Sequence, residues 1–446
     1  MATAFPRDFV WGVASSAYQI EGATETDGRG PSIWDDFCRR DGAIADASSG
    51  RDACEHYRNW GEDLELMKWL GIDAYRFSVA WPRVLPQGHG HVEPRGLDFY
   101  SRLVDELLEA GITPWVTLYH WDLPSALEER GGWRERDTAK HFVEYARVVM
   151  GRLGDRVRHV MTHNEPWCAS MLGHWQGTHA PGMREPAAAL RAAHHLLLSH
   201  GWAVDALREL CPEAKIGIAL NPAPVHAHDP LNASDREAAR AEDATRNRIW
   251  LDPLYGRGYP EDMIADLRRL GAWPEGEPDW LQPGDLEAIA TPTDFLALNY
   301  YNPVRVAADA SVDTLPHGAR VTDIGWEIEP EGLRDLLERL HRDYDPPSLV
   351  ISENGAADST RPDEDGQIND VMRCAYLREH VAAVADARIA GIPVDAYFAW
   401  TLCDNFEWAE GYTQRFGLVW YERSDGERKP KRSAHQYREF IAAQRS

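Results

Sequence analysis

Short runs of apolar, β-branched and aromatic residues recur along the whole chain, and between them apolar residues repeat at three- and four-residue steps. The runs have the length of buried β-strands, and the intervening repeats have the period of amphipathic helices. Eight strands are predicted: Phe9–Val13, Ala74–Val79, Pro114–Tyr119, His159–Thr162, Lys215–Ala219, Phe295–Asn299, Leu349–Ser352 and Val394–Ala399. The alternation predicts parallel strands joined by helical crossovers.

Two of the intervening segments show the helical pattern clearly. Segments 57–70 and 97–108 each place their apolar residues on one face, and each is followed by a glycine, Gly71 or Gly111, which is a typical stop signal. Eight strand–helix units close naturally into a barrel. We therefore predict an α/β fold, a single (β/α)8 TIM barrel with long βα loops, as one domain over residues 1–446.

An open, doubly wound sheet is the alternative to the barrel. Its main signature would be a Gly-Xaa-Gly-Xaa-Xaa-Gly motif after the first strand, or a phosphate-binding loop with Gly-Lys-Ser/Thr. Neither pattern occurs in the sequence. The stretch 221–252 is rich in proline and charge, and we interpret it as a long insertion around one barrel rather than as a linker between domains.

The charge balance is strongly acidic and bears on partners. Lys and Arg total 47 against 72 Asp and Glu, so the formal net charge is −25, which would repel a phosphate backbone. No nucleic acid partner is expected. No apolar run is long enough to span a bilayer, so no membrane partner is expected either. The basic cluster Arg428–Arg432 is predicted to be a solvated surface segment without a function.

Two further features suggest where the protein works. Met1–Asp8 lacks the basic region and apolar stretch of a secretory signal, and the six cysteines are scattered without close pairs. A cytoplasmic protein with reduced thiols is therefore predicted. In that compartment the sequon at Asn232 would not be glycosylated. The pair His194 and His195 is interpreted as part of a helix rather than as a metal site.

The candidate chemistry lies just past the predicted strands. In a barrel the carboxyl ends of the strands converge on one mouth. The polar and aromatic residues collected there are Gln19, Arg76, His120, Trp121, Asn164, Glu165, Asn299, Tyr301, Glu353, Trp400, Glu407 and Trp408. Carboxylates, amides and indoles together suit a pyranose, whose hydroxyls need hydrogen bonds and whose C–H faces pack on aromatic rings.

Glu165 and Glu353 are the candidate catalytic pair. Each lies in a short motif, Thr162–Pro166 or Ile351–Gly355, directly after a predicted strand. Hydrolysis of a glycosidic bond needs one carboxyl group to protonate the leaving oxygen and a second to attack or stabilise the anomeric carbon. Strand ends of a closed sheet can hold two such groups rigidly.

A series of motifs, in order along the chain, resembles the β-glucosidases of glycoside hydrolase family 1, and the match runs from Phe5 to about Lys431. The motifs are Phe9–Gly12, Ala17–Gly22, Arg76–Ser78, Tyr119–Asp122, Thr162–Pro166, Asn299–Tyr301, Ile351–Gly355 and Trp400–Trp408. The resemblance implies a retaining double displacement on terminal β-D-glucosyl, β-D-galactosyl or β-D-fucosyl residues. Its substrates would be small oligosaccharides or aryl and alkyl β-glycosides, and no cofactor or metal is expected.

The resemblance also implies roles for the residues at the mouth. Glu353 would attack the anomeric carbon, and Glu165 would protonate the leaving oxygen and later deprotonate a water molecule. Arg76 and Tyr301 would lie beside Glu353 and favour its carboxylate. The implied sugar contacts are Gln19, His120, Trp121, Asn164, Asn299, Tyr301, Trp400, Glu407 and Trp408. Trp326 is expected to be a platform for the leaving group.

Three alternatives to a β-glucosidase make different demands on the site residues. A 6-phospho-β-glycosidase would need a cation near the sugar 6-position, where Glu407 would instead repel a phosphate. A non-catalytic glycan-binding barrel would be expected to have lost one of the two glutamates, whereas this chain has both Glu165 and Glu353. Transglycosylation uses the same covalent intermediate, so the sequence leaves it open, as it leaves open whether the chain forms a homo-oligomer.

Overall fold

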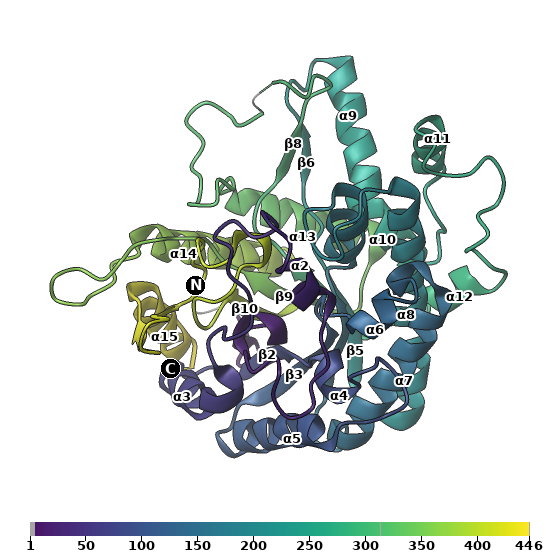
Figure 1. Cartoon of the computed structure of the whole chain (residues 1–446). Coiled ribbons are helices and arrows are strands. Elements are labelled where there is room, and N and C mark those ends of the chain that lie inside the picture. The colour runs from purple at the N-terminus through teal and green to yellow at the C-terminus, as the bar shows by residue number, and fades with distance from the viewer. Residues whose placement is uncertain (1–4, 313, 446) are drawn as a thin grey trace.

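A computed structural model describes residues 5–312 and 314–445 of the chain. Its centre is a closed barrel of eight parallel strands in the order β1-β10-β9-β7-β5-β4-β3-β2 (Figure 1). The strands are β1 (Val10–Ala14), β2 (Ala74–Ser78), β3 (Thr113–Tyr119), β4 (His159–Asn164), β5 (Lys215–Leu220), β7 (Phe295–Asn299), β9 (Leu349–Asn354) and β10 (Val394–Trp400). All eight predicted strands are present and their ends agree within two residues, so the predicted (β/α)8 barrel is confirmed.

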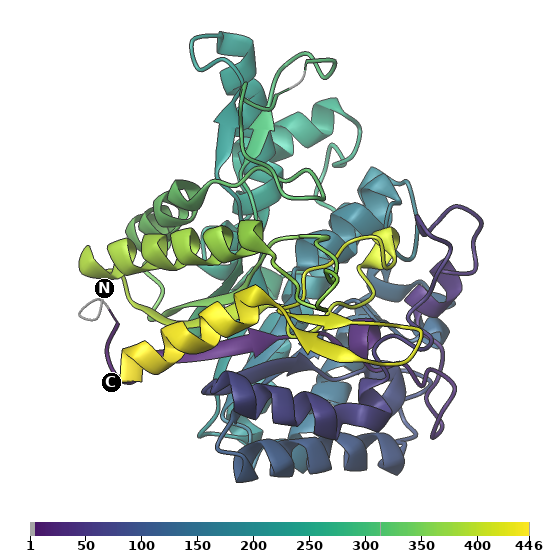
Figure 2. The ribbon, with the colours of Figure 1, turned by 90° about the vertical axis from the view of Figure 1, so that its left-hand side faces the viewer.

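Helices surround the barrel and cover its outer surface (Figures 1 and 2). The α-helices are α1 (Ala17–Ile20), α2 (Ile33–Phe37), α3 (His56–Leu70), α4 (Trp81–Val84), α5 (Pro94–Glu109), α6 (Ser125–Glu128), α7 (Arg136–Leu153), α8 (Pro186–Leu210), α9 (Ala233–Asp243), α10 (Ile249–Leu254), α11 (Glu261–Arg269), α12 (Asp285–Ile289), α13 (Pro330–Tyr344), α14 (Val371–Ile389) and α15 (Arg432–Arg445). Short 3-10 turns occur at η1 (Gly132–Arg134) and η4 (Trp408–Glu410). Two segments, η2 (Cys168–Gln176) and η3 (Ala244–Arg248), are π-helical.

The two helices predicted from periodicity form for identifiable local reasons. Helix α5 begins at Pro94, whose fixed φ suits a first helical position, and Glu93 caps it by accepting a hydrogen bond from the Arg95 N–H. Helix α3 ends at Gly71, which has a φ of 70° and donates its N–H to carbonyls of the last turn. The predicted glycine stop is therefore present as a left-handed cap.

Insertions between strands and helices build a lobe beyond the barrel. Strand β6 (Val225–Ala227) pairs in parallel with β8 (Val304–Val306), and both views show these strands and α9 projecting away from the barrel (Figures 1 and 2). Near the C-terminus, β11 (Val419–Tyr421) pairs antiparallel with β12 (Arg428–Pro430). Neither small sheet was predicted, because three-residue strands carry too little periodicity to be recognised.

The prediction that Arg428–Arg432 is a solvated segment is wrong for Arg428 and Lys431, although Arg432 is exposed. The Arg428 side chain is only 4% exposed, and its Nε donates to Asp63 Oδ1 at 2.7 Å. Lys431 is fully buried, and its Nζ donates to Asp404 Oδ1 at 2.6 Å. These cations connect the C-terminal segment to carboxylates elsewhere in the fold, so the cluster is structural.

The predicted helical position of His194 and His195 is confirmed, since both lie inside α8. All six cysteines are free thiols. His194 lies inside α8, where it hydrogen-bonds Tyr259 Oη and Asp285 Oδ2, and no group of three or more potential ligands among the described residues is arranged to hold a metal ion. No helix in the described part of the chain is both long and apolar enough to cross a bilayer.

Candidate active site

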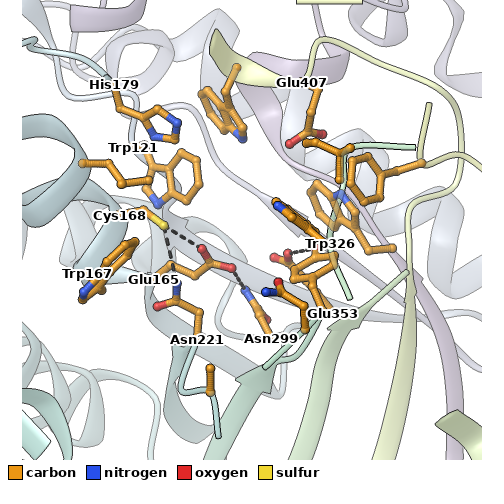
Figure 3. Close-up of a pocket in the computed structure, with 18 of the residues that line it drawn as sticks. Trp121, Glu165, Trp167, Cys168, His179, Asn221, Asn299, Trp326, Glu353 and Glu407 are labelled. Atoms are coloured by element: carbon orange, nitrogen blue, oxygen red, sulfur yellow. Dashed lines mark hydrogen bonds between the residues drawn. The ribbon is translucent and has the colours of Figure 1, made fainter. Parts of the chain in front are cut away.

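A cavity of about 370 Å³ opens at the carboxyl ends of the barrel strands, where the sequence placed the candidate chemistry (Figure 3). Most of the predicted site residues line it: His120, Trp121, Glu165, Asn299, Tyr301, Trp326, Glu353, Trp400, Glu407 and Trp408. Residues far apart in the sequence, such as Glu165 and Glu353, therefore face one space. The cavity is of the size typical for small-molecule sites.

The other three predicted residues, Gln19, Arg76 and Asn164, are buried, and each hydrogen-bonds a residue that lines the cavity. Arg76 Nη2 donates to Asn164 Oδ1 at 2.6 Å, and Asn164 Nδ2 lies 3.0 Å from His120 Nε2. Gln19 Nε2 donates to the Phe406 carbonyl at 2.9 Å and to Glu407 Oε2 at 3.4 Å. Together these contacts fix the orientation of the polar groups that face the cavity.

Glu353 lies near the end of β9, and each of its carboxyl oxygens accepts a hydrogen bond. Arg76 Nη1 lies 2.5 Å from Oε1, and Tyr301 Oη donates to Oε2 at 2.6 Å. Burial raises the pKa of Glu353, whereas Arg76 and Tyr301 act in the opposite direction. Two donors on two oxygens favour the carboxylate form, which is the form a nucleophile needs.

The backbone after Glu353 is packed too tightly for a side chain at Gly355. A Cβ atom there would lie 1.9 Å from the Trp400 carbonyl oxygen. Glycine therefore allows the end of β9 to approach the end of β10 closely.

Glu165 has a different environment at the end of β4. Asn299 Nδ2 donates to its Oε1 at 2.6 Å, and the Cys168 thiol donates to its Oε2 at 2.9 Å. Burial and the nearby charge of Glu353 raise the pKa of Glu165 to about 7, although both hydrogen bonds lower it. The carboxyl group can therefore carry a proton near neutral pH, as a general acid must.

A third carboxyl group, Glu407, shares the same cavity. Burial, followed by the charges of Glu353 and Glu165, raises the pKa of Glu407 to about 8. Among the described residues, Arg76 is the only arginine whose guanidinium hydrogen-bonds any of these three groups. Because three buried carboxyls face one bound cation, at least one of them is held in its neutral form around pH 7.

Aromatic rings form one wall of the cavity. His120 stacks between Trp400, at 5.9 Å between centroids, and Trp408, at 5.8 Å. Burial and the charge of Arg76 hold the pKa of His120 well below its usual range, so the ring is neutral. Trp121 Nε1 donates to the Asn164 carbonyl at 2.8 Å, and Trp326 meets Tyr301 edge to face at 5.3 Å.

Three lining residues have unusual backbone conformations. Glu165, Trp121 and Trp408 have φ values of 43°, 78° and 50°, in the left-handed region that non-glycine residues rarely adopt. Such conformations cost of order 1–3 kcal/mol each and cluster at functional sites. The surrounding fold therefore imposes the directions of these side chains.

Sequence reasoning missed several lining residues on the Glu165 side: Trp167, Cys168, Leu172, His179, Asn221 and Arg246. Asn221 directly follows β5, so the rule that located the other polar residues could have found it. Trp167 and Cys168 adjoin the Glu165 motif. Arg246 lies in a long insertion, in the π-helical segment η3, and no sequence pattern marked it.

Comparisons with known proteins agree with this geometry. The family model described as "Glycosyl hydrolase family 1" matches residues 1–446. The chain is 45% identical to β-glucosidase A of Acetivibrio thermocellus, with 98% of each chain covered, and 41% identical to a bifunctional β-D-glucosidase/β-D-fucosidase of Bifidobacterium breve, with 99% covered. A structure of the β-glucosidase from Thermotoga maritima in complex with galacto-hydroximolactam has a TM-score of 0.93, 42% identity and 99% coverage of both chains.

Proposed function

The chain belongs to glycosyl hydrolase family 1, and on that premise we propose that it is a retaining β-glucosidase that releases terminal, non-reducing β-D-glucosyl residues. One observation carries the proposal. Glu165 and Glu353 face the same buried cavity, and their hydrogen-bond partners differ so that one favours a carboxylate and the other can hold a proton. A retaining glycosidase needs this division of ionisation states.

In the first step Glu353 attacks the anomeric carbon while Glu165 donates its proton to the leaving oxygen. The bond from the sugar to the aglycone breaks, and a covalent glycosyl ester forms on Glu353. Arg76 and Tyr301 hold the attacking carboxylate in place through their hydrogen bonds to its two oxygens. The expected gap between the two carboxyls in this route is about 5–5.5 Å.

In the second step Glu165 acts as a base toward a water molecule, which displaces Glu353 and restores the β configuration. The charge of Glu353 contributes to the raised pKa of Glu165. Because the ester carries no charge, that contribution disappears in the intermediate and the pKa of Glu165 falls. The same carboxyl group is then better suited to accept a proton.

The glycone is proposed to lie against Trp400 and Trp408, with its hydroxyls bound by Gln19, His120, Asn164, Glu407 and the remaining predicted residues. Asn164 is expected to serve the 2-hydroxyl, where contacts strengthen as the ring approaches the oxocarbenium-like transition state. Glu407 would repel a phosphate on the sugar, which argues against a 6-phosphoglycosidase. The names of the relatives support activity on β-D-fucosides and β-D-galactosides as well.

We further propose that residues 1–446 act as one catalytic domain in the cytoplasm, on substrates such as cellobiose released during polysaccharide degradation. Six free thiols support a reducing compartment. The family resemblance supports a reaction completed by two carboxyls and a water molecule. Neither the substrate nor the compartment affects the assignment of the two glutamates.

Azide rescue tests the assignment of the two roles. In Glu353→Ala, turnover of an activated aryl β-D-glucoside is expected to be lost, and azide should restore cleavage with an inverted, α-configured glucosyl azide as the product. In Glu165→Ala, azide should instead give a retained, β-configured product, because the ester still forms on Glu353. The opposite pattern of products would reverse the roles.

A substrate panel tests the glycone assignment. We expect kcat/KM to be measurable for aryl β-D-glucoside, β-D-galactoside and β-D-fucoside, and negligible for the 6-phosphoglucoside. Equal rates on the phosphorylated and unphosphorylated glucosides would overturn the proposed role of Glu407.

A further inference from the structure

Arg246 is an unpaired arginine in the wall of the cavity. It lines the cavity, yet its guanidinium has no hydrogen bond or ion pair with any described residue, and its Nε is buried without a partner. Its neighbours in the same insertion behave differently: Arg240 pairs with Asp262 and Asp266, and Arg248 pairs with Asp243 and Asp262. Carboxylates are therefore abundant nearby, but none is placed on Arg246.

The guanidinium is positioned by an aromatic ring instead of by an anion. Its Cζ lies 4.1 Å from the centroid of the Trp167 ring. A cation stacked on an indole face is attracted to it without using its N–H donors, so those donors remain free for a ligand. Arg246 lies within the π-helical segment η3, and Trp167 directly precedes the π-helical segment η2. Such local geometry is frequent at functional sites.

Arg246 lies on the leaving-group side of the proposed reaction. Figure 3 shows Trp167 and Asn221 on the side of Glu165 that faces away from Glu407. Glu165 is close enough to Arg246 for its charge to raise the pKa of the guanidinium. Because Glu165 protonates the leaving oxygen, the region around Arg246 and Trp167 would receive the aglycone rather than the glucosyl ring.

The electrostatics of this position favour an anion. Burial lowers the pKa of Arg246, and the charge of Glu242 opposes that effect, but Glu242 makes no ion pair with it. A guanidinium remains protonated, and one whose Nε is shielded from solvent without a partner is costly to leave unpaired. A carboxylate can accept two parallel N–H bonds from it. The chain as a whole carries a net charge of −25, so attraction of an anionic substrate must come from a local cation.

Apolar side chains elsewhere in the cavity wall could contact a flat ring of the ligand. Leu172, Ile324 and Trp326 line the cavity together with Arg246. We propose that Arg246 is a specificity-determining residue that binds a carboxylate on the aglycone, so that β-D-glucosides of carboxylate-bearing phenols are preferred substrates. This inference rests on the proposed β-glucosidase function, and it assigns the class of leaving group that the site selects.

Paired aryl glucosides measure this preference. The substrates are 4-carboxyphenyl β-D-glucoside and 4-carbamoylphenyl β-D-glucoside, which have similar shapes and differ in charge. The preference is the ratio of their kcat/KM values. The intrinsic reactivities of the two leaving groups are the same for wild type and variant, so they cancel when the two ratios are compared. In Arg246→Met we expect the preference for the carboxylate to fall at least about tenfold, mainly through KM, because a charge-assisted bidentate contact is lost.

Two further variants separate local binding from general charge. Arg246→Lys keeps the charge but not the fork, so it should retain part of the preference. Arg248→Met removes the same charge two residues away, from a guanidinium paired with Asp243 and Asp262, and should leave the ratio within about twofold of wild type. If Arg248→Met lowers the ratio as much as Arg246→Met does, the effect is a long-range field and the inference is wrong.

Other outcomes are equally decisive. An unchanged ratio in Arg246→Met overturns the inference, and so does a loss of cellobiose hydrolysis as large as the loss on the carboxyphenyl substrate, since Arg246 would then serve sugar hydroxyls. Should Arg246→Met fail to fold, the wild-type enzyme still gives an answer: 4-hydroxybenzoate should inhibit more strongly than 4-hydroxybenzamide, and equal inhibition refutes the inference. Failure of the proposed function itself would appear as no hydrolysis of uncharged phenyl β-D-glucoside.

Discussion

The thiol of Cys168 is expected to set the pH range of the reaction through Glu165. The thiol donates to Glu165 Oε2 at 2.9 Å, inside a buried site, and Asn221 Nδ2 lies 3.5 Å from its sulfur. This hydrogen bond is strongest when the carboxyl group is ionised, so it lowers the pKa of Glu165. Replacing Cys168 by alanine should therefore raise that pKa.

The size of the shift follows from the strength of the bond. Hydrogen bonds to charged groups contribute about 1.5–3 kcal/mol, and a thiol is a weak donor, so about 1 kcal/mol is a reasonable value here. Because one pKa unit corresponds to about 1.36 kcal/mol, the alanine variant should have a Glu165 pKa about 0.7 units higher than wild type.

The pH profile of kcat/KM reports this pKa in the free enzyme. Glu165 must be protonated to act as the acid, so kcat/KM falls as pH rises through its pKa, which lies at about 7 in the wild type. In Cys168→Ala the alkaline limb should move to higher pH by about 0.7 pH units. The assay uses an aryl β-D-glucoside with a poor leaving group, for which protonation of the leaving oxygen matters most.

Cys168→Ser is the matched control, because a hydroxyl keeps a donor at the same position and donates more strongly than a thiol. Its alkaline limb should lie at or below that of the wild type. An alanine variant whose limb stays in place or moves to lower pH would refute the reasoning, as would a serine variant that shifts upward like alanine.

Three further predictions concern other contacts. In Glu353→Gln the pKa of Glu165 should fall below the wild-type value of about 7, because a neighbouring negative charge is removed. A ¹³C-carboxyl NMR titration measures this pKa, and an unchanged value would show that the charge of Glu353 does not act on Glu165. Tyr301→Phe should reduce kcat/KM by about 10–100-fold, because a charge-assisted hydrogen bond to the nucleophile is lost, while urea unfolding shows little change; near-normal kinetics would argue against that role. Lys431→Met should lower the free energy of unfolding by about 3 kcal/mol because it breaks a buried ion pair, whereas Lys429→Met, at a half-exposed site, should change it by about 0.5 kcal/mol or less, and equal effects would contradict this.

The barrel could be predicted from the sequence because strands buried on both faces read as nearly continuous apolar runs. The ends of the strands were less accurate where function intervenes. Strand β4 continues through Asn164 and β9 through Asn354, so polar residues belong to the strands that hold them. Polarity at these positions was interpreted as the end of a strand.

Long-range partners account for what could not be predicted. The basic cluster at 428–432 looks solvated on its own, and only the fold brings Asp63 and Asp404 to it. Arg246 is one of many arginines in a charged insertion. Only the fold shows that Arg246 lines the cavity and has no carboxylate partner there, unlike the neighbouring arginines. Local pattern carries no information about such pairings.

The sugar pocket is built from both ends of the chain. Gln19, shortly after β1, hydrogen-bonds Phe406 and Glu407 across a separation of 387 and 388 residues, and β1 itself lies between β2 and β10. During synthesis the N-terminal part, with Gln19, leaves the ribosome first, and its partners Phe406 and Glu407 are made last. A chain that stops before Glu407 lacks one wall of the pocket as well as the contacts that hold Gln19. Enzyme activity during translation would therefore first appear only after the C-terminal segment has left the ribosome, which makes activity a direct reporter of completed folding.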